Sequence, residues 1–199
     1  MNNNSFFKKK LTFNENSIFF TFNEKINIVM DSCEDSLMER TAEILVDEGD
    51  DLLEVGFGMG IFASYAQKRK PKTHTIVEGH PQVYEKLKIW SEDKKNVNII
   101  YGDWTTVIES INSMKYDSVY FDTHCDQNTY KFFHFIKDFL KPGGKFSRFG
   151  LDLSNNNLCQ KEFDGCQIKK LVHEHHPVSP SEHVKYFTKN TFPICVVSL

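Results

Sequence analysis

The chain has 199 residues and a mass of 23.2 kDa, which suits one domain or one domain with an added arm. Apolar residues make up 40% and charged residues 26%, and the 18 phenylalanines could not all stay solvated, so a wholly disordered chain is excluded. The net charge of −3 excludes the strongly basic field that holds a nucleic-acid backbone non-specifically, and we expect no nucleic-acid partner.

Membrane and export signals are not expected either. No apolar run approaches the roughly 18 to 20 residues of a membrane helix. At the N-terminus, Lys8–Lys10 follow a short apolar patch instead of preceding a long one, which is not typical of a secretory signal. The cysteines are odd in number and form no C-x-x-C pair, which favours reduced thiols: Cys33, Cys125, Cys159, Cys166 and Cys195. We therefore expect a cytoplasmic protein without membrane contact, and a homodimer stays open.

Residues 1–30 are rich in Asn and Phe and have no helical period. We interpret them as an arm that packs its phenylalanines on the main domain, 31–199, with a short strand at Ser17–Phe22. A partly disordered tail is the alternative.

From Asp31 onward, strands and helices alternate. Asp31 or Ser32 can cap a first helix, with Glu34 or Asp35 completing a capping box. Strands are predicted at 51–55, 73–78, 97–101, 116–121 and 146–149, with helices at 61–69, 81–90, after Trp104 to about 111, and at 129–140. We expect a turn at Lys141–Gly144, a loop at Ser154–Asn157 and two late strands at 167–174 and 191–199. This order predicts an α/β, Rossmann-like fold: a mostly parallel seven-stranded sheet with helices on both faces and an antiparallel C-terminal end.

A glycine-rich turn follows the first strand of this sheet. Gly56, Gly58 and Gly60 stand at a helix N-terminus, where ligands of open parallel sheets bind. Glu78 ends the next strand, 18 residues after Gly60, and an acidic side chain there can accept both hydroxyls of a ribose. The loop is G-x-G-x-G without a phosphate-binding lysine, so a cofactor with ribose but no pyrophosphate suits it, and we predict S-adenosylmethionine (SAM). A tight structural turn is the alternative.

These residues resemble guanidinoacetate N-methyltransferase and the related arginine N-methyltransferases of fungi and plants. The similar segments are Val29–Met38 (with Cys33 where the family has Trp), Glu54–Gly60, His74–Glu78, Gly102–Trp104, Tyr120–Thr123, Leu140–Gly144 and the tail Val178–Leu199. The similarity covers about residues 25–199. The arm has no clear counterpart, and the region between Phe149 and Val178 is shorter than in the guanidinoacetate enzyme.

The resemblance implies a class I SAM-dependent methyltransferase that releases S-adenosylhomocysteine. It implies that the cofactor contacts are Met30, Met38, Glu54, Gly56, Phe57, Gly58, Glu78, Gly102, Asp103, Trp104 and Asp122. Planar guanidinium groups form bidentate hydrogen bonds with carboxylates. Asp122 is therefore the predicted anchor and proton acceptor and Glu34 the second anchor, both at acceptor-binding positions of the family, while His124 could help to move the proton.

Each of these residues has a plainer interpretation. Asp122 could cap the next segment, Glu34 could serve only the capping box, and His124 could face solvent. Trp104, Met30 and Met38 could be core residues, and Asp103 a surface charge.

We predict methyl transfer to a guanidino nitrogen of a small molecule such as guanidinoacetate, arginine or a related metabolite. A protein arginine side chain and a non-catalytic SAM-binding module are the alternatives. His173, His175 and His176 with Glu174 suggest metal ligands by type. Because neighbours on a strand point to opposite faces, and no second cluster stands nearby, we predict no metal.

Overall fold

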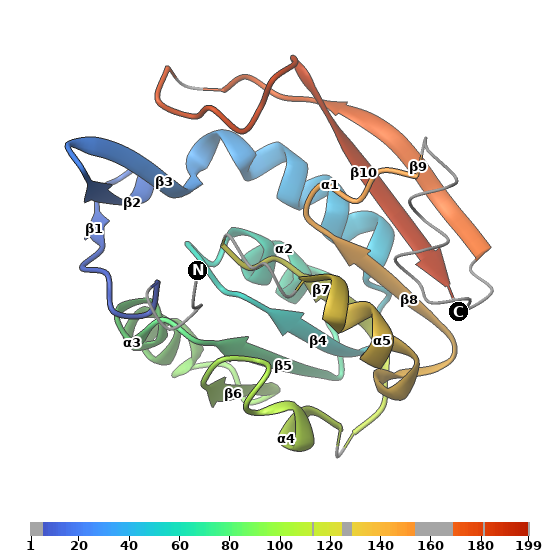
Figure 1. The fold of residues 1–199 in the computed structure, drawn as a ribbon. Helices are drawn as coiled ribbons and strands as arrows, with labels where there is room; N and C mark the ends of the chain where they lie inside the picture. Colours follow the sequence, from blue (N-terminus) through green and yellow to red (C-terminus); the bar gives the residue numbers. More distant parts are fainter. Residues whose placement is uncertain (1–5, 113, 125–128, 154–168, 181, 199) are drawn as a thin grey trace.

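A seven-stranded sheet forms the centre of the computed structural model, which describes residues 6–112, 114–124, 129–153, 169–180 and 182–198 (Figure 1). In the order β6-β5-β4-β7-β8-β10-β9, the strands are Val97–Tyr101, Thr73–Glu78, Asp51–Val55, Tyr116–Phe121, Leu140–Arg148, Thr191–Ser198 and Lys169–Pro177. The first five run parallel, whereas β10 pairs antiparallel with both β8 and β9. The predicted α/β class, with its antiparallel C-terminal end, is confirmed.

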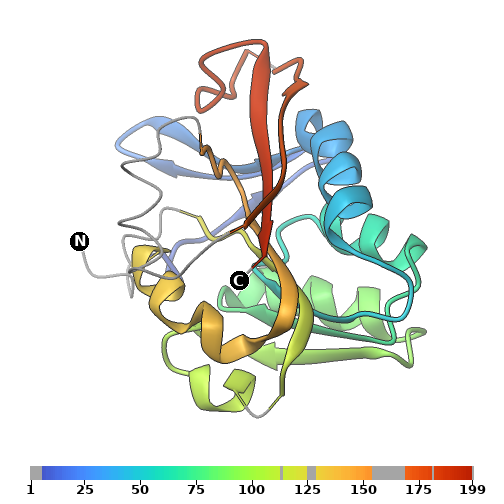
Figure 2. The ribbon, with the colours of Figure 1, turned by 90° about the vertical axis from the view of Figure 1, so that its right-hand side faces the viewer.

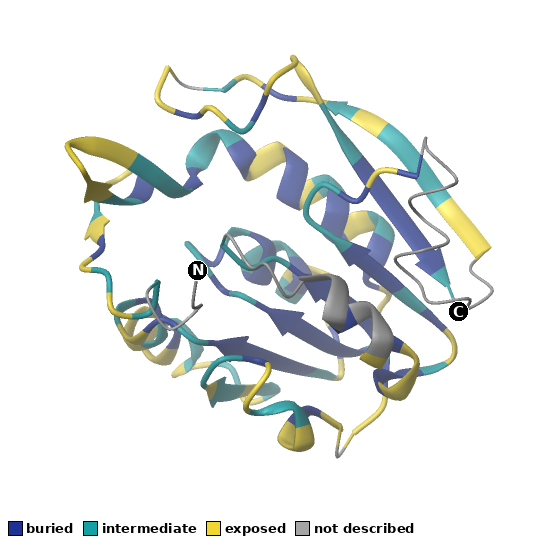
Figure 3. Cartoon of the chain, in the orientation of Figure 1, coloured by how far each residue is buried: buried dark blue, intermediate teal, exposed yellow. Residues whose placement is uncertain are grey.

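Helices cover both faces of this sheet (Figure 2). Their bounds are α1 Asp35–Leu45, α2 Ile61–Lys68, α3 Pro81–Ser91, α4 Ile108–Asn112 and α5 Thr129–Phe139. Helices α1 to α3 pack on one face and α4 and α5 on the other, where Phe132, Ile136 and Phe139 are buried against the sheet. The central strands β4, β5 and β7 are buried along most of their length (Figure 3), which explains their near-continuous apolar sequences.

Several boundaries differ from the sequence prediction; β9, for example, ends at Pro177 and not at residue 174. Strand β8 begins at Leu140, which pairs with Tyr116, and pairing resumes at Lys145 opposite Ser118. The expected turn at 141–144 is therefore a bulge within the strand, a position that tolerates proline and glycine. After Trp104 the chain forms turns first, and α4 begins only at Ile108.

The arm forms a small antiparallel sheet of its own, β1 (Thr12–Phe13), β2 (Ser17–Phe22) and β3 (Lys25–Asp31). The predicted strand at 17–22 is confirmed, and β1 and β3 were not predicted. Phe6, Phe13 and Phe20 pack against the cluster around α3, as the arm interpretation expects. The small sheet lies at the end of the large sheet where β4 and β5 finish (Figure 1).

Several sequence interpretations concern residues outside the described part of the chain. They are the loop at Ser154–Asn157 and the cysteines 125, 159 and 166. Within the described part, Cys33 is partly exposed and Cys195 is buried, and the reduced state of the cysteines stays a prediction. None of the helices described here has the length and apolar character to cross a membrane.

Candidate active site

A cavity of about 750 Å³ lies at the carboxyl ends of the parallel strands, where open α/β sheets bind ligands. It brings together all the predicted site residues: Met30, Glu34, Met38, Glu54, Gly56, Phe57, Gly58, Glu78, Gly102, Asp103, Trp104, Asp122 and His124. These residues come from five separate parts of the chain. Their convergence is what a single binding site for cofactor and acceptor requires.

The glycine loop passes very close to the end of β7. Gly56 has a φ of +95°, and a Cβ atom there would lie 1.8 Å from the carbonyl oxygen of Asp122. The Asp122 N–H donates to the Val55 carbonyl oxygen at 2.8 Å, so the two strand ends are held together. A side chain at position 56 would push them apart, which explains the glycine.

Glu78 ties the end of β5 to this loop. Its carboxylate accepts hydrogen bonds from the N–H groups of Phe57 (3.0 Å) and His80 (2.6 Å). The N–H groups of Gly58 and Gly79 also interact with this carboxylate, so ribose hydroxyls would have to share its acceptor positions with backbone amides. Burial raises the pKa of Glu78 above its ordinary value, and the backbone N–H groups oppose that shift.

Glu54 uses its carboxylate mainly inward. The Gln67 side-chain amide donates to His74 Nδ1 at 3.0 Å, so Nε2 carries the ring proton and donates to Glu54 Oε2 at 2.8 Å. Burial lowers the pKa of His74 to about 3 and raises that of Glu54, so burial favours the uncharged form of each group. Glu54 borders the cavity, but its clearest role is to join β4 to β5.

Glu34 stands at the turn before α1 and is held from two sides. Its Oε1 accepts the Asp31 N–H at 3.0 Å, which completes the predicted capping box, and it also accepts the hydroxyl of Tyr186. Both of these hydrogen bonds go to Oε1 of Glu34, and neither involves its other carboxylate oxygen, Oε2. The capping interpretation and the acceptor-site interpretation are therefore compatible, because one oxygen holds the turn while the other can meet a ligand.

The cavity is strongly acidic. Burial, together with the Asp122 charge, raises the pKa of Glu34 to about 8. Burial and the Glu78 charge raise the pKa of Asp122 to about 7. Five carboxyl groups line the cavity, whereas the described lining residues include one lysine, Lys9, whose Nζ lies 4.1 Å from the ring centre of Phe22. Such a site favours a cationic ligand, whose charge would restore both carboxylates to their ionised form.

His124 is partly exposed and packs against the arm. Its ring lies 4.7 Å from that of Phe6 and 5.9 Å from that of Phe20. Burial lowers the pKa of His124 to about 4, so the ring is neutral at pH 7. A ring that resists protonation is a weaker proton acceptor than Asp122.

The remaining predicted residues combine core and wall positions. Met30 Sδ accepts the Met59 N–H at 3.1 Å and supports the loop, and Met38 Sδ accepts the Tyr120 hydroxyl at 3.3 Å. Trp104 is buried, with its ring 5.7 Å from that of Phe121. Asp103 Oδ1 accepts the Thr105 N–H and hydroxyl in a local turn: its lone pairs are partly used. Met30, Met38 and Trp104 are therefore buried like core residues, and all four side chains still line the cavity.

Sequence reasoning missed several lining residues. Tyr186 and Phe149 come from the C-terminal part, Tyr120 from β7, and Phe6 and Phe20 from the arm. Tyr120 stacks on Phe62 with ring centres 4.0 Å apart. Tyr120 is two residues before Asp122, on the same strand end, so its position could have indicated a place in the site. Tyr186 is 152 positions from Glu34, and no local pattern connects the two.

Solved structures of low sequence identity share this architecture. A Pyrococcus furiosus methyltransferase aligns with a TM-score of 0.63 and 15% identity, covering 82% of each chain. Aeropyrum pernix fibrillarin with bound SAM aligns with a TM-score of 0.61 and 17% identity, covering 94% of this chain and 84% of that one. Strand order, glycine loop and cavity position thus define the class I SAM-dependent methyltransferase fold.

Sequence comparisons identify the family within that class. The family model described as guanidinoacetate N-methyltransferase matches residues 8–179, and the chain belongs to this family. The match confirms the resemblance and also includes most of the arm, for which the motifs gave no counterpart. It ends at residue 179, so the similarity of the tail beyond it stays a prediction.

Curated relatives carry the name protein arginine N-methyltransferase 2. The protein of Yarrowia lipolytica is 33% identical over 166 residues, which are 77% of this chain and 34% of the relative. That of Saccharomyces cerevisiae is 31% identical over 170 residues, 79% of this chain and 40% of the relative. The chain therefore spans well under half the length of these relatives.

Proposed function

We propose that this chain transfers a methyl group from SAM to a guanidino nitrogen of a small-molecule acceptor. The observation that carries the proposal is the pair Glu34, which is buried, and Asp122, which is partly exposed, in one acidic cavity beside a glycine loop. A flat cation that donates bidentate hydrogen bonds to carboxylates is the ligand that such a pair suits best.

The residues present fit SAM. The loop Gly56–Gly60 lets backbone approach a ligand closely, Glu78 places a carboxylate acceptor on the cavity wall, and the acidic surroundings suit a sulfonium charge. Met30, Met38, Gly102, Asp103 and Trp104 would form the remaining walls. When bound, SAM supplies an electrophilic methyl group.

The chain's own contribution is to position the acceptor and to take its proton. Removing a guanidinium proton at pH 7 in advance would cost about 8 kcal/mol, since its pKa is about 12.5 to 13.8. Glu34 and Asp122 instead hold the cation with one nitrogen toward the donor, and the nitrogen loses its proton as its bond to carbon forms. Asp122 receives that proton, and we propose that His124 helps to transfer it onward.

A small acceptor is favoured by the burial of Glu34 and by the aromatic side chains of the arm. Glu34 is 3% exposed, and Phe6, Phe20 and Phe22 of the arm line the same cavity. The names of the relatives favour a second candidate, an arginine side chain in a protein, because a slender side chain could also reach Glu34 and Asp122. A methyl-accepting peptide must then find room beside the arm.

Mass spectrometry after incubation with SAM tests the acceptor class. The panel contains guanidinoacetate, free arginine, related small guanidino compounds and arginine-containing peptides. We expect methylated small compounds. Methylation of peptides alone would favour the second candidate, and tight binding of SAM without turnover of any acceptor would favour a non-catalytic module.

Replacing Glu78 by alanine should weaken SAM binding about 10- to 100-fold, since a lost charge-assisted hydrogen bond costs about 1.5–3 kcal/mol. Calorimetry with S-adenosylhomocysteine measures the affinity. Circular dichroism checks that the loop amides freed from Glu78 leave the fold intact. An unchanged affinity would remove Glu78 from the cofactor site.

The homodimer and the cytoplasmic location remain predictions from the sequence, as does the division into an arm, 1–30, and a methyltransferase domain, 31–199.

A further inference from the structure

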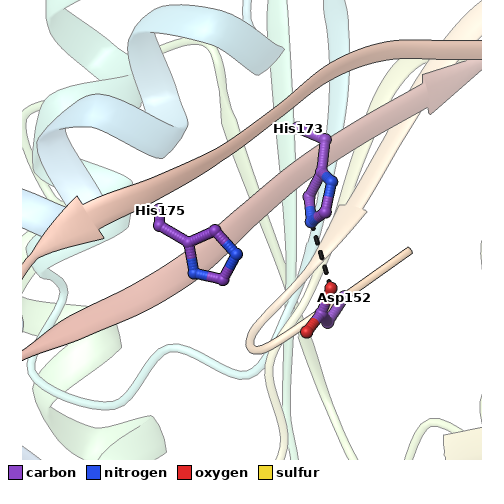
Figure 4. Close-up of side chains that lie close together, drawn as sticks. All are labelled: Asp152, His173 and His175. Carbon is purple, nitrogen blue, oxygen red and sulfur yellow. Dashed lines mark hydrogen bonds and ion pairs between the residues drawn. The ribbon is translucent and has the colours of Figure 1, made fainter. Parts of the chain in front are cut away.

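Three potential metal ligands meet outside the active-site cavity. They are Asp152, on the segment after β8, and His173 and His175 on the edge strand β9 (Figure 4). One ligand atom of each lies within 4.8 Å of the others. His173 Nε2 and Asp152 Oδ1 are already 3.1 Å apart.

The strand separates these histidines from their neighbours in sequence. Glu174 forms two hydrogen bonds with Arg40 of α1, at 2.8 and 3.1 Å, and His176 bonds Ser36 at 3.1 Å. Both therefore face α1. His173 and His175 are two positions apart and share the opposite face, with ring centres 5.7 Å apart. The sequence argument against a metal applies to Glu174 and His176 but not to this pair.

The distances suit one ion after a small side-chain adjustment. Zinc binds imidazole nitrogen and carboxylate oxygen at about 2.0–2.2 Å, so ligand atoms of a tetrahedral site lie about 3.3 Å apart. His173 and Asp152 already meet that spacing. His175 is exposed, so its ring can turn inward without displacing packed groups.

We propose that Asp152, His173 and His175 bind one divalent ion of the borderline transition metals, with Zn²⁺ as the reference ion. Two imidazoles and a carboxylate match the preferences of zinc, cobalt and nickel, and not those of the oxygen-seeking Mg²⁺ or Ca²⁺. Water would complete the coordination. The ion would fasten the segment that follows Phe149, a cavity residue, to the edge of the sheet.

Calorimetric titration of the full chain tests this site, after treatment with EDTA and removal of any affinity tag. We expect one Zn²⁺ per chain. The variants D152N, H173N and H175N should each lower the zinc affinity at least about tenfold, because even the loss of a group that only hydrogen-bonds to a metal ligand lowers affinity by that factor. H176N is the matched control because this histidine faces α1, and it should bind zinc like the unmodified chain.

Two further measurements separate ligation from folding. Thermal melting without metal shows whether each variant folds, and H175N should fold because His175 is exposed. Added zinc should raise the melting temperature of the unmodified chain and of H176N but not of H175N. No zinc binding by the unmodified chain, full binding by H175N, or equal loss in H176N would each overturn the proposal.

Discussion

Replacing Asp122 by asparagine is expected to lower the rate of methyl transfer by about 10- to 1000-fold, the range for a lost general base or anchor. The amide has the same shape as the carboxyl group, but it carries no charge to hold a guanidinium and accepts no proton. Because the Asp122 N–H bond to Val55 comes from the backbone, the variant keeps the link between β7 and β4. The measurement is turnover of the best acceptor found in the panel.

Cofactor affinity and a distant substitution provide the controls for this result. Binding of S-adenosylhomocysteine should change little, because the loop and Glu78 are intact. Asp138→Asn removes the same charge from the exposed side of α5 and should leave turnover unchanged. Near-normal turnover in Asp122→Asn would exclude Asp122 from the mechanism.

The large sheet was predictable because its signals are local. Strands β4, β5, β6 and β7 begin and end where the sequence alternates apolar runs with glycine, proline and charged residues, and their predicted bounds hold. The carboxyl ends of parallel strands meet at one edge. The strand pattern alone therefore predicts that Gly56, Glu78 and Asp122 lie close together.

The small sheet was missed because its hairpin lacks the usual signal. Strands β2 and β3 are joined at Asn23 and Glu24, which have φ values of +48° and +60°. Hairpins with two such residues usually contain Asn-Gly or Asp-Gly, and a glutamate at the second position hides the turn. The Phe-rich strands on either side then look like an irregular arm.

Contacts between distant segments are the other part that no pattern revealed. Tyr186 contacts Glu34 from 152 positions away. His173 meets Asp152 because β10 pairs with both β8 and β9 and so brings β9 near the segment that follows β8. Residue types suggested chemistry in both places. The contact between His173 and Asp152 depends on how the antiparallel C-terminal strands pair. The sequence predicts those two strands but not which of their residues lie opposite one another.

Glu34→Gln should raise the KM for a guanidinium acceptor about 10- to 100-fold, because it removes one charge-assisted bond worth about 1.5–3 kcal/mol. Glutamine is the conservative choice here. Its amide oxygen can still accept the Asp31 N–H of the capping box and the Tyr186 hydroxyl, so α1 and the C-terminal contact should persist. Glu39→Gln, exposed on the same helix, is the matched control and should leave KM unchanged.

The pH dependence of kcat/KM distinguishes a lost anchor from a disturbed fold. In the free chain, the pKa values of Asp122 and Glu34 are raised to about 7 and about 8, so both carboxyl groups are protonated at low pH and ionise as the pH rises. A cationic acceptor needs the ionised forms, so kcat/KM should rise through this range and level off above it. In Glu34→Gln the upper ionisation should vanish while the rise near 7 remains. If Glu34→Gln keeps both ionisations and an unchanged KM, Glu34 only stabilises the turn before α1, and Asp122 holds the acceptor alone.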